Sequence, residues 1–262
     1  MMRLLKDRVI FLTGGSKGIG LECALKYAEE GAKLAIISND QVSLTYAISI
    51  LGEQHLGLLA DVSCAHDMEQ AVKDTLLNFG KIDVIHNNAG IAYPSKNVHQ
   101  TDETEWNNLF NINVKGIYHT TKYGLNALIH SKGCIINTSS LVGEIGQENH
   151  AVYAATKGAV NALTKSMALD YAKYKIRVNA VAPAGVWTEM LEEWGKEQND
   201  MEGIKNYLDG IHALGYCPQG DVVADACVFL ASDKARFITG IIMPVSGGAE
   251  LGYKKVNQLE TI

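Results

Sequence analysis

The chain has 262 residues, 47% of them hydrophobic and 20% charged, a composition that excludes disordered and fibrous proteins and suffices for one sizeable α/β domain. Its formal net charge of -6 and its pI near 5.8 disfavour nucleic acid or an anionic membrane as a partner, because both need clustered Lys and Arg. A small, neutral or weakly charged molecule fits better.

Short apolar runs, each typical of a buried strand, alternate with longer segments of helical periodicity. The runs are residues 8–13, 32–38, 55–60, 82–87, 133–139, 176–182 and 238–245, and helical segments include 18–30, 66–79, 104–130, 151–173 and 220–231. Strands that are apolar throughout are typical of a parallel sheet with helices on both faces. The alternation predicts a doubly wound parallel sheet of about seven strands. No linker or repeat divides the chain, which predicts a single domain over residues 1–262.

The first strand leads into the sequence TGGSKGIG, in which Gly14, Gly18 and Gly20 precede a helix. Such glycines allow a tight turn and let the helix N-terminus approach a pyrophosphate, whose charge is stabilised by free N–H groups and the helix dipole. Glycine-rich turns also occur for packing reasons alone. After the first strand of a β-α-β unit, however, the pattern favours a dinucleotide-binding loop.

The second strand ends at Ser38 and Asn39, where proteins that bind NAD usually carry an Asp or Glu for the adenosine ribose. That carboxylate is missing at Ser38. Lys17 in the glycine loop is suited to meet the 2′-phosphate of NADP, or is simply a solvated lysine, whereas Asp40 would repel the phosphate. The sequence therefore leaves the choice between NAD and NADP open.

Two further strand ends carry candidate ligand contacts, at the edge where a doubly wound sheet binds its ligand. Asp61 ends the third strand, and the sequence NNAG, residues 87–90, ends the fourth. Asp61 is nearly as well suited to cap the helix that follows. The small Ala89 and Gly90 allow a flat ligand to approach the backbone, although a tight turn needs the same residues.

Tyr153 and Lys157 form the strongest candidate for chemistry, because residues at i and i+4 share one face of a helix. A nearby ammonium favours the phenolate, and each unit of pKa lowering corresponds to about 1.4 kcal/mol. Tyr153 is then suited to exchange a proton with a carbonyl or hydroxyl oxygen while hydride moves. Taken alone, however, most Tyr/Lys pairs at this spacing are surface residues.

Two other polar residues support the proton-transfer reading. Ser140 ends the fifth strand, directly before the helix of Tyr153, so its hydroxyl could bind the same substrate oxygen; a turn serine is the alternative. Asn113 lies within a helical segment, where asparagine is unfavourable and Gly116 loosens the turn. A relay position explains this cost better than packing does, provided that the other residues are catalytic.

Residues from about 187 to 218 interrupt the alternation between the sixth strand and the next helix. A long excursion at the carboxyl end of a strand commonly covers a substrate. This segment is therefore the predicted substrate lid.

The cysteines and histidines show no local metal-binding pattern. The five cysteines, at positions 23, 64, 134, 217 and 227, never form a CxxC pair, and the eight histidines show no HxH or HExxH spacing. No metal site is therefore predicted, and a reducing cytoplasm is the expected compartment. No signal-peptide cleavage site precedes the first strand, and no apolar stretch approaches the roughly 18 residues of a membrane span.

Taken in order, TGGSKGIG, NNAG, NVKG, and Ser140 followed by YAATK resemble the short-chain dehydrogenase/reductase family across essentially the whole chain. The resemblance implies a Rossmann-type fold and a nicotinamide cofactor. It also implies a catalytic tetrad of Asn113, Ser140, Tyr153 and Lys157, in which Lys157 also binds the nicotinamide ribose and Asn113 holds a proton-relay water. The implied cofactor contacts are Gly14, Ser16, Lys17, Gly18, Ile19, Gly20, Ser38, Asn39, Asp61, Val62, Asn88, Ala89, Gly90, Tyr153, Lys157, Pro183, Val186 and Thr188.

Further stretches, including SSLVGEIGQENHAVYAATKGAV and SGGAELGY, look like the branch of this family that contains L-fucose dehydrogenase, also called 17β-hydroxysteroid dehydrogenase type 14. On that likeness Ser140, Gln147, Tyr153 and Trp187 would contact the substrate, and Glu144, His150, Met190 and Trp194 are weaker candidates. Trp187 and Trp194 are equally suited to packing within the lid. The chain departs from the branch at Ser38, which replaces an acidic residue, and from the family at Ala184 after Pro183.

The sequence thus leads to the hypothesis of a cytoplasmic NAD- or NADP-dependent oxidoreductase that moves hydride between nicotinamide and a secondary alcohol or ketone, a sugar such as L-fucose. The alternatives are a reductase of steroid or 3-oxoacyl-thioester ketones, and a non-catalytic regulator that senses the dinucleotide. The acidic charge balance disfavours an acidic carrier protein as a partner, and a sensor would not need the tetrad. Family likeness also implies a homotetramer in which the helices at 104–130 and 151–173 pair between subunits.

Overall fold

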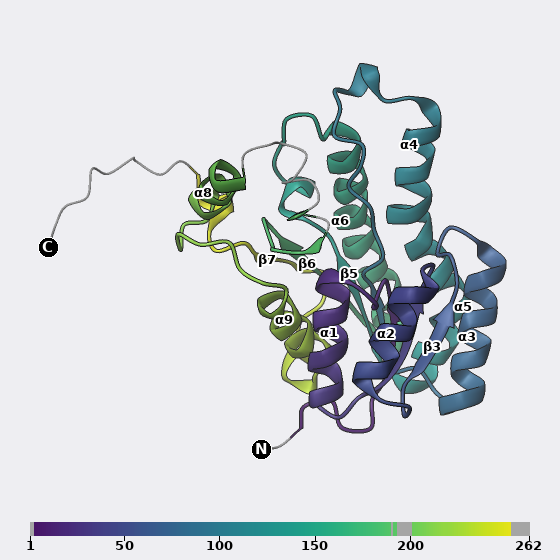
Figure 1. Ribbon diagram of the computed structural model, residues 1–262. Coiled ribbons are helices and arrows are strands. Elements are labelled where there is room, and N and C mark those ends of the chain that lie inside the picture. The colour runs from purple at the N-terminus through teal and green to yellow at the C-terminus, as the bar shows by residue number, and fades with distance from the viewer. Residues whose placement is uncertain (1–2, 190, 193–200, 253–262) are drawn as a thin grey trace, which may run out of the picture.

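The computed structural model describes residues 3–189, 191–192 and 201–252, which pack around one sheet of seven parallel strands (Figure 1). The strands are β1 (Val9–Thr13), β2 (Lys33–Ser38), β3 (Leu56–Leu59), β4 (Val84–Asn87), β5 (Cys134–Thr138), β6 (Arg177–Pro183) and β7 (Ile242–Val245). Six of them lie within the predicted apolar runs, and β6 extends one residue beyond its run of 176–182, which confirms the predicted doubly wound parallel sheet.

The strand order is β3-β2-β1-β4-β5-β6-β7, so the chain winds outward from β1 and then returns to β4 on the other side of it. The boundary between β1 and β4 is the topological switch point, where the loops leaving the two strands part. Thr13 pairs with Asn87, and Asn87 pairs with Asn137. The carboxyl ends of these central strands therefore align, and the residues that follow them meet at one edge.

Helices cover both faces of the sheet (Figure 1). On one face lie α1 (Gly18–Glu29), α2 (Gln41–Leu51) and α9 (Asp221–Ala231); on the other lie α3 (Ala65–Phe79), α5 (Gly116–Ser131) and α6 (Ala151–Tyr171). Side chains alternate along a strand, so Ile10 and Leu12 pack under the first helix layer while Phe11 packs under the second. This alternation explains why every residue of β1 is buried.

The segment predicted as one helix over 104–130 is divided in the structure. A capping box formed by Asp102 and Glu105 starts α4 (Glu103–Phe110), a π-helical turn follows at Asn111–Lys115, and α5 then begins. The π turn contains Asn113, whose side chain bonds outside the helix. Wider turns of this kind are frequent at functional sites. The sequence predicted that an asparagine in the middle of a helix is unfavourable, and the helix here changes from α to π geometry at that residue.

The excursion after β6 contains α8 (Met201–Ile211), which the sequence analysis did not distinguish. Ile204 and Leu208 of α8 form a small apolar cluster with Cys217, and Trp187 packs against it. Met190 and Trp194, two weaker substrate candidates, lie outside the described residues. Short 3-10 turns occupy Val98–Gln100, Leu141–Gly143, Ala172–Tyr174, Asp233–Ala235 and Ala249–Leu251. Within the described ranges no helix is both long and apolar enough to span a membrane.

Candidate active site

The glycine loop and the NNAG loop are packed against each other at the switch point. Gly14 has a φ of +62°, and a Cβ built on it would lie 2.8 Å from the Cα of Ala89. A Cβ on Gly20 would collide with the carbonyl oxygen of Gly14. The Asn88 amide donates to that same oxygen at 3.0 Å. Only glycine allows this approach of two backbones, which explains two of the three glycines in the motif.

The first strand supplies a further tie between the two loops. The Thr13 hydroxyl accepts hydrogen bonds from the backbone N–H groups of Asn88 and Ala89, both at 3.1 Å. Helix α1 begins at Gly18, and the side chain of its N-cap residue, Lys17, makes no capping hydrogen bond. The first N–H groups of α1 therefore provide the anion-binding end that a dinucleotide pyrophosphate requires.

Ser38, the last residue of β2, takes part in a cluster of hydroxyl groups. Its hydroxyl is buried and accepts a hydrogen bond from Ser16 at 2.8 Å, and Ser16 also bonds Ser43 at 2.9 Å. Ser38 therefore belongs to a hydroxyl cluster under the glycine loop, and Asn39 next to it is exposed. A short side chain folds back onto its neighbours, and sequence position alone does not reveal this.

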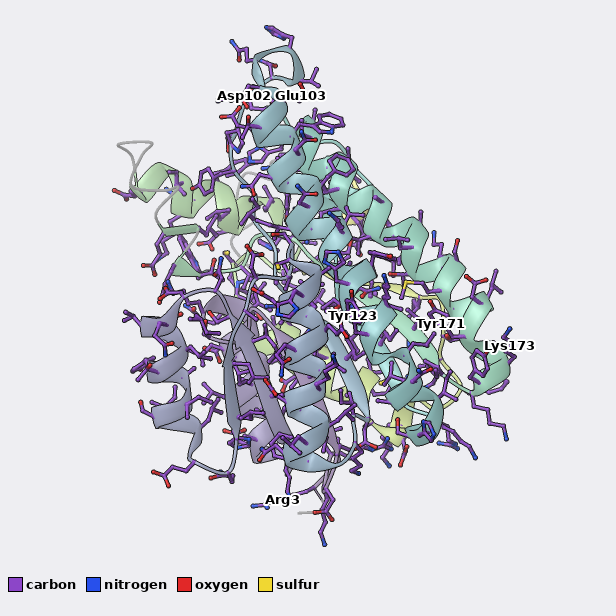
Figure 2. The ribbon with its side chains drawn as sticks, turned by 90° about the vertical axis from the view of Figure 1, so that its right-hand side faces the viewer. Arg3, Asp102, Glu103, Tyr123, Tyr171 and Lys173 are labelled. Atoms are coloured by element: carbon purple, nitrogen blue, oxygen red, sulfur yellow. The ribbon has the colours of Figure 1, made fainter. Side chains whose placement is uncertain are left out.

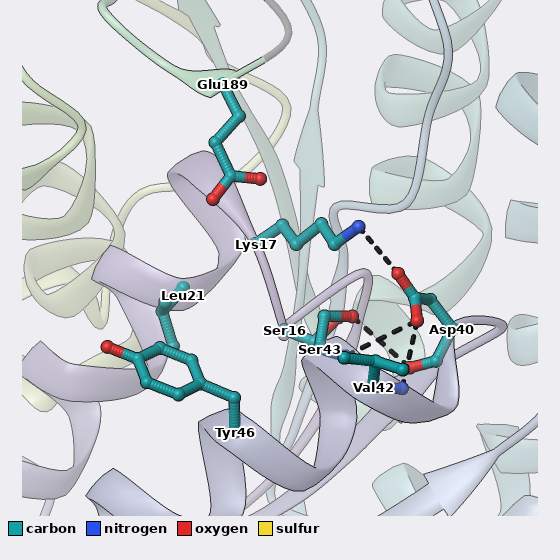
Figure 3. A pocket seen from close by; sticks show the side chains of 8 residues that line it. All are labelled: Ser16, Lys17, Leu21, Asp40, Val42, Ser43, Tyr46 and Glu189. Atoms are coloured by element: carbon teal, nitrogen blue, oxygen red, sulfur yellow. Dashed lines mark hydrogen bonds and ion pairs between the residues drawn. The ribbon is translucent and has the colours of Figure 1, made fainter.

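Lys17 and Asp40 form an ion pair with 2.6 Å between Nζ and Oδ2 (Figure 3). Asp40 is also the N-cap of α2 and accepts from the backbone of Val42 and Ser43. The hydrogen bond from Lys17, together with these amides, lowers the pKa of the Asp40 carboxyl. A cavity of about 320 Å³ beside the pair is lined by Ser16, Lys17, Leu21, Asp40, Val42, Ser43, Tyr46 and Glu189.

At the end of β3, Asp61 accepts two hydrogen bonds from Ser63, from its backbone N–H and its hydroxyl, each at 2.8 Å. The helix that follows has Cys64 as its N-cap. Asp61 therefore stabilises a turn and does not cap that helix, which removes the structural alternative considered for it. Val62 is buried and packs against Gly116, where a Cβ would lie 3.0 Å from the Val62 side chain.

Asn113 connects the NNAG loop to α6. Its amide oxygen accepts from the N–H of Ile91 at 2.8 Å, while its NH₂ group donates to the carbonyl of Ile91 at 2.8 Å and to the hydroxyl of Thr156 at 3.0 Å. The side chain is buried. A Cβ on Gly90 would lie 3.3 Å from the Asn113 amide oxygen and 3.6 Å from Lys157 Nζ, so Asn113, Gly90 and Lys157 are immediate neighbours.

Ser140, Tyr153 and Lys157 lie together where β5 ends. Lys157 Nζ donates to the Thr138 carbonyl at 2.8 Å and is 5.6 Å from the centre of the Tyr153 ring. Ser140 is the N-cap of the turn Leu141–Gly143, and its hydroxyl donates to the carbonyl of Pro183 at 3.5 Å. Ser140 also lies close enough to Tyr153 to act on the pKa of its phenol. The structure therefore gathers all four residues of the expected tetrad at one edge of the sheet.

The protonation of this group differs from the expectation of an acidified phenol. Burial raises the pKa of Tyr153 and outweighs the hydrogen bond from Ser140, which lowers it. Burial also lowers the pKa of Lys157 to about 8. Both effects have one cause, because removal from water disfavours the charged form of either group. The i, i+4 spacing predicted proximity correctly but carried no information on burial.

The expected substrate residues are more scattered. Gln147 and Glu144 are exposed, and His150 bonds the Ser95 hydroxyl at 2.9 Å with its ring edge-on to Tyr153. Trp187 donates its backbone N–H to the carbonyl of Pro218 at 2.9 Å and packs in the α8 cluster. The packing alternative for Trp187 thus has direct structural support.

The remaining cofactor candidates follow β6. Pro183 is its last residue, and Val186 is buried. A Cβ on Gly18 would lie 3.4 Å from the Thr188 methyl group, which places the start of the excursion next to the glycine loop. The sequence analysis did not identify Thr13, Thr138 and Thr156, which hold the site together. Thr138 acts on Lys157 through its carbonyl, which every residue has, so no sequence signal marked it.

Known proteins resemble this chain over nearly its whole length. A protein-family profile described as enoyl-(acyl carrier protein) reductase matches residues 14–250. L-Fucose dehydrogenase of Bos taurus is 39% identical over 94% of this chain and 90% of its own length. Two solved structures are also similar. That of 3-ketoacyl-(acyl-carrier-protein) reductase from Brucella melitensis complexed with NADH has a TM-score of 0.86 and 31% identity, over 94% of this chain and 99% of that one. The ligand-free aldohexose dehydrogenase of Thermoplasma acidophilum has a TM-score of 0.89 and 29% identity, over 99% and 100% of the two chains.

Proposed function

We propose that the substrate of this protein is a sugar such as L-fucose. The premise is that the chain belongs to the short-chain dehydrogenase/reductase family and is an NAD(P)-dependent oxidoreductase acting on CH–OH groups. Two of the proteins it resembles are named for sugar oxidation, the L-fucose and aldohexose dehydrogenases. The observation that carries the proposal is the convergence of Ser140, Tyr153 and Lys157 beside Gly90 at the edge next to the glycine loop.

The described residues fit a dinucleotide. The backbones of Gly14 and Ala89 lie so close together that a Cβ on Gly14 would clash with Ala89. The N-terminus of α1 beside them is suited to bind the pyrophosphate. We place the adenosine end over Asn39, Asp61 and Val62, and the nicotinamide end near Gly90. When bound, the nicotinamide accepts or supplies the hydride.

The four polar residues divide the proton chemistry among them. The Ser140 hydroxyl binds the substrate oxygen and the Tyr153 phenol exchanges a proton with it. Lys157 is fixed by the Thr138 carbonyl, so its ammonium lies beside the Tyr153 ring and favours the phenolate once charge develops there. Asn113 holds the loop of Ile91 in place and is the proposed site of a relay water.

We propose that NAD is the preferred cofactor. The positive charge of Lys17 is engaged by Asp40, and a 2′-phosphate at this position would meet the Asp40 carboxylate as a like charge. Asp40 itself is available as an acceptor for ribose hydroxyls. One related structure contains NADH.

The test is turnover by the purified protein with NAD or NADP and a panel of aldoses, polyols, steroids and 3-oxoacyl thioesters. Reduction of the nucleotide with L-fucose or a related aldose is expected. Tyr153→Phe should abolish turnover with cofactor affinity nearly unchanged, because only the hydroxyl is lost. Retained activity in this variant would remove Tyr153 from the mechanism. Cofactor binding without turnover of any substrate would support the alternative of a non-catalytic regulator that senses the dinucleotide.

A reductase of 3-oxoacyl thioesters is the second candidate, because the matching family profile and the Brucella melitensis structure both carry acyl-carrier-protein reductase names. Such an enzyme needs a basic surface for its acidic carrier protein. The net charge of -6 weighs against that partner. Faster turnover of a thioester than of any aldose would favour this candidate over the sugar.

We further propose a homotetramer in the cytoplasm. Figure 2 shows the face of α4, α5 and α6, where Tyr123 and Tyr171 are labelled. On these helices Tyr118 is 53% and Leu169 is 81% exposed, which suits helix pairing between subunits. Leu169→Glu should lower the mass in light scattering, whereas an unchanged mass would argue against pairing through α6. All five cysteines are free thiols, which fits a reducing compartment.

A further inference from the structure

Three metal-ligating side chains that are far apart in the sequence meet in the core between α1, α9 and the sheet. They are Cys23 of α1, His86 of β4 and Cys227 of α9, and all three are fully buried. Their sulfur and ring nitrogen atoms lie within 4.8 Å of one another. Figure 1 shows α1 and α9 side by side in front of the sheet, and this close packing brings the two cysteines together over His86.

The cluster contains none of the proposed catalytic residues, although it adjoins the site through Thr138. Cys23 and Cys227 belong to an apolar core cluster that includes Leu12, Ala24 and Ala224, and the hydroxyls of Tyr27 and Thr138 contact His86. His86 is the unusual member, because it occupies a central strand where a parallel sheet favours aliphatic residues. Packing alone would be served by any aliphatic side chain at this position.

We propose that Cys23, His86 and Cys227 form a buried binding site for a thiophilic divalent metal ion, with zinc as the ion that fits best. Two thiolates, a neutral imidazole and a divalent cation sum to zero charge, which makes burial of the centre far less costly than burial of a single ion. Thiolate and imidazole ligands also select zinc over the harder magnesium and calcium ions. The absence of local spacing motifs had predicted no metal site, but ligands drawn from three elements leave no such motif.

The distances are compatible with zinc after a small contraction. Zinc–sulfur bonds of about 2.3 Å and zinc–nitrogen bonds of about 2.1 Å place tetrahedral ligand atoms roughly 3.5–3.8 Å apart. Cys227 Sγ is already 4.0 Å from His86 Nε2. The widest separation, up to 4.8 Å, would therefore close by about 1 Å, which side-chain rotation can supply.

The surroundings of His86 are those of a metal ligand with its second nitrogen fixed. Nδ1 lies 3.1 Å from the Tyr27 hydroxyl and would carry the ring proton and donate to that oxygen once Nε2 binds a metal ion. Tyr27 is fully buried and holds the imidazole ring edge-on.

A short chain of hydrogen bonds links the cluster to the cofactor loops. His86 Nε2 is 3.0 Å from the Thr138 hydroxyl, Thr138 donates to the Asn88 side chain at 3.2 Å, and Asn88 donates to the Gly14 carbonyl. A metal ion at Nε2 would take this nitrogen away from Thr138. We therefore expect the metal-loaded protein to bind NAD more weakly, by about fivefold or more.

The test is the metal content of the full chain expressed in zinc-supplemented medium, because a buried site is best loaded during folding. After desalting, elemental analysis should find about one zinc per chain. The Cys23→Ala/Cys227→Ala variant should lose this zinc while keeping its fold, because Ala replaces Cys as a small apolar residue. Cys64→Ala, at an exposed cysteine, and Cys134→Ala, at a buried one outside the cluster, should retain it.

Cobalt loading gives a second measurement that needs no variant. Thiolate-to-cobalt charge-transfer absorption in the unaltered protein would report sulfur ligation even where a substitution impairs folding. A protein that retains no metal, a cobalt complex without this absorption, or equal zinc in the double alanine variant would overturn the site. NAD affinity measured with and without zinc tests the link, and equal affinities would refute the connection through Thr138.

Discussion

Replacing Lys157 by methionine should make the protein more stable at neutral pH although it removes a proposed catalytic group. The side chain is 5% exposed, and burial lowers its pKa from 10.5 to about 8. A difference of about 2.5 pKa units corresponds to roughly 3 kcal/mol of unfavourable folding free energy while the amine is charged in both states. The substitution also removes the hydrogen bond to the Thr138 carbonyl, which lowers the free energy of unfolding by about 1–2 kcal/mol. A net gain of about 1–2 kcal/mol in unfolding free energy is expected.

The sign of the pH dependence follows from proton binding. Between pH 8 and 10.5 the unfolded chain keeps the Lys157 proton and the folded protein releases it, so folded stability rises with pH in this window. The penalty is fully present below pH 8 and is gone above 10.5. The advantage of Lys157→Met over the unaltered protein should therefore be largest near neutral pH and should shrink as the pH approaches 10.5.

Urea unfolding from pH 7 to 10.5 measures this difference directly. Lys165→Met is the matched control, because Lys165 lies on the same helix but is exposed, and its replacement should leave the unfolding free energy unchanged at every pH. A Lys157→Met protein that is less stable than the unaltered one at neutral pH, or a difference that does not vary with pH, would show that Lys157 is not held at a desolvation cost.

Three other changes test the cofactor end. Asp40→Asn keeps an N-cap of α2 but removes the negative charge beside Lys17, so the ratio of kcat/KM for NADP to that for NAD should rise. Asp102→Asn at the cap of α4 should leave this ratio unchanged, and equal ratios in the unaltered protein and both variants would reject the proposed role of Asp40. Gly20→Ala should abolish NAD binding in a fluorescence titration, because its Cβ would displace the Gly14 carbonyl. Asn113→Ala leaves the N–H and carbonyl of Ile91 without their buried partner. The free energy of unfolding measured in urea should therefore fall by about 2–4 kcal/mol, and the KM for NAD should rise. Wild-type stability would mean that other contacts hold the loop of Ile91.

The sequence predicted the sheet well because burial on both sides leaves an apolar record in every strand. The same pattern was less informative for helices. α2 and α8 were not distinguished, and the π turn at Asn111–Lys115 was visible only as an unfavourable asparagine. A change of helix type depends on where one side chain finds its partners, here Ile91 and Thr156, and those partners are 22 and 43 residues distant in the chain.

At the site, sequence spacing predicted which residues meet but not what they contact. Lys17 and Asp40 were recognised as opposing influences on a 2′-phosphate, yet their ion pair joins two loops that only the sheet brings together. Ser38 was predicted as a cofactor contact from its place at the end of β2, and its hydrogen bond with Ser16 was not foreseen. In both cases the missing information is the direction of a short or flexible side chain, which tertiary packing sets.

The same reasoning explains why burial, rather than the bare Tyr/Lys spacing, governs the proposed chemistry. In water two charges 4 Å apart interact by about 1 kcal/mol, and near a protein surface by about 4 kcal/mol. Burial pushes Tyr153 and Lys157 each toward its neutral form, and it also places them where charges interact more strongly than in water. That environment strengthens the effect of any charge that a ligand brings to the edge of the sheet. The desolvation that raises the pKa of Tyr153 is therefore also what lets a small change in local charge lower it again.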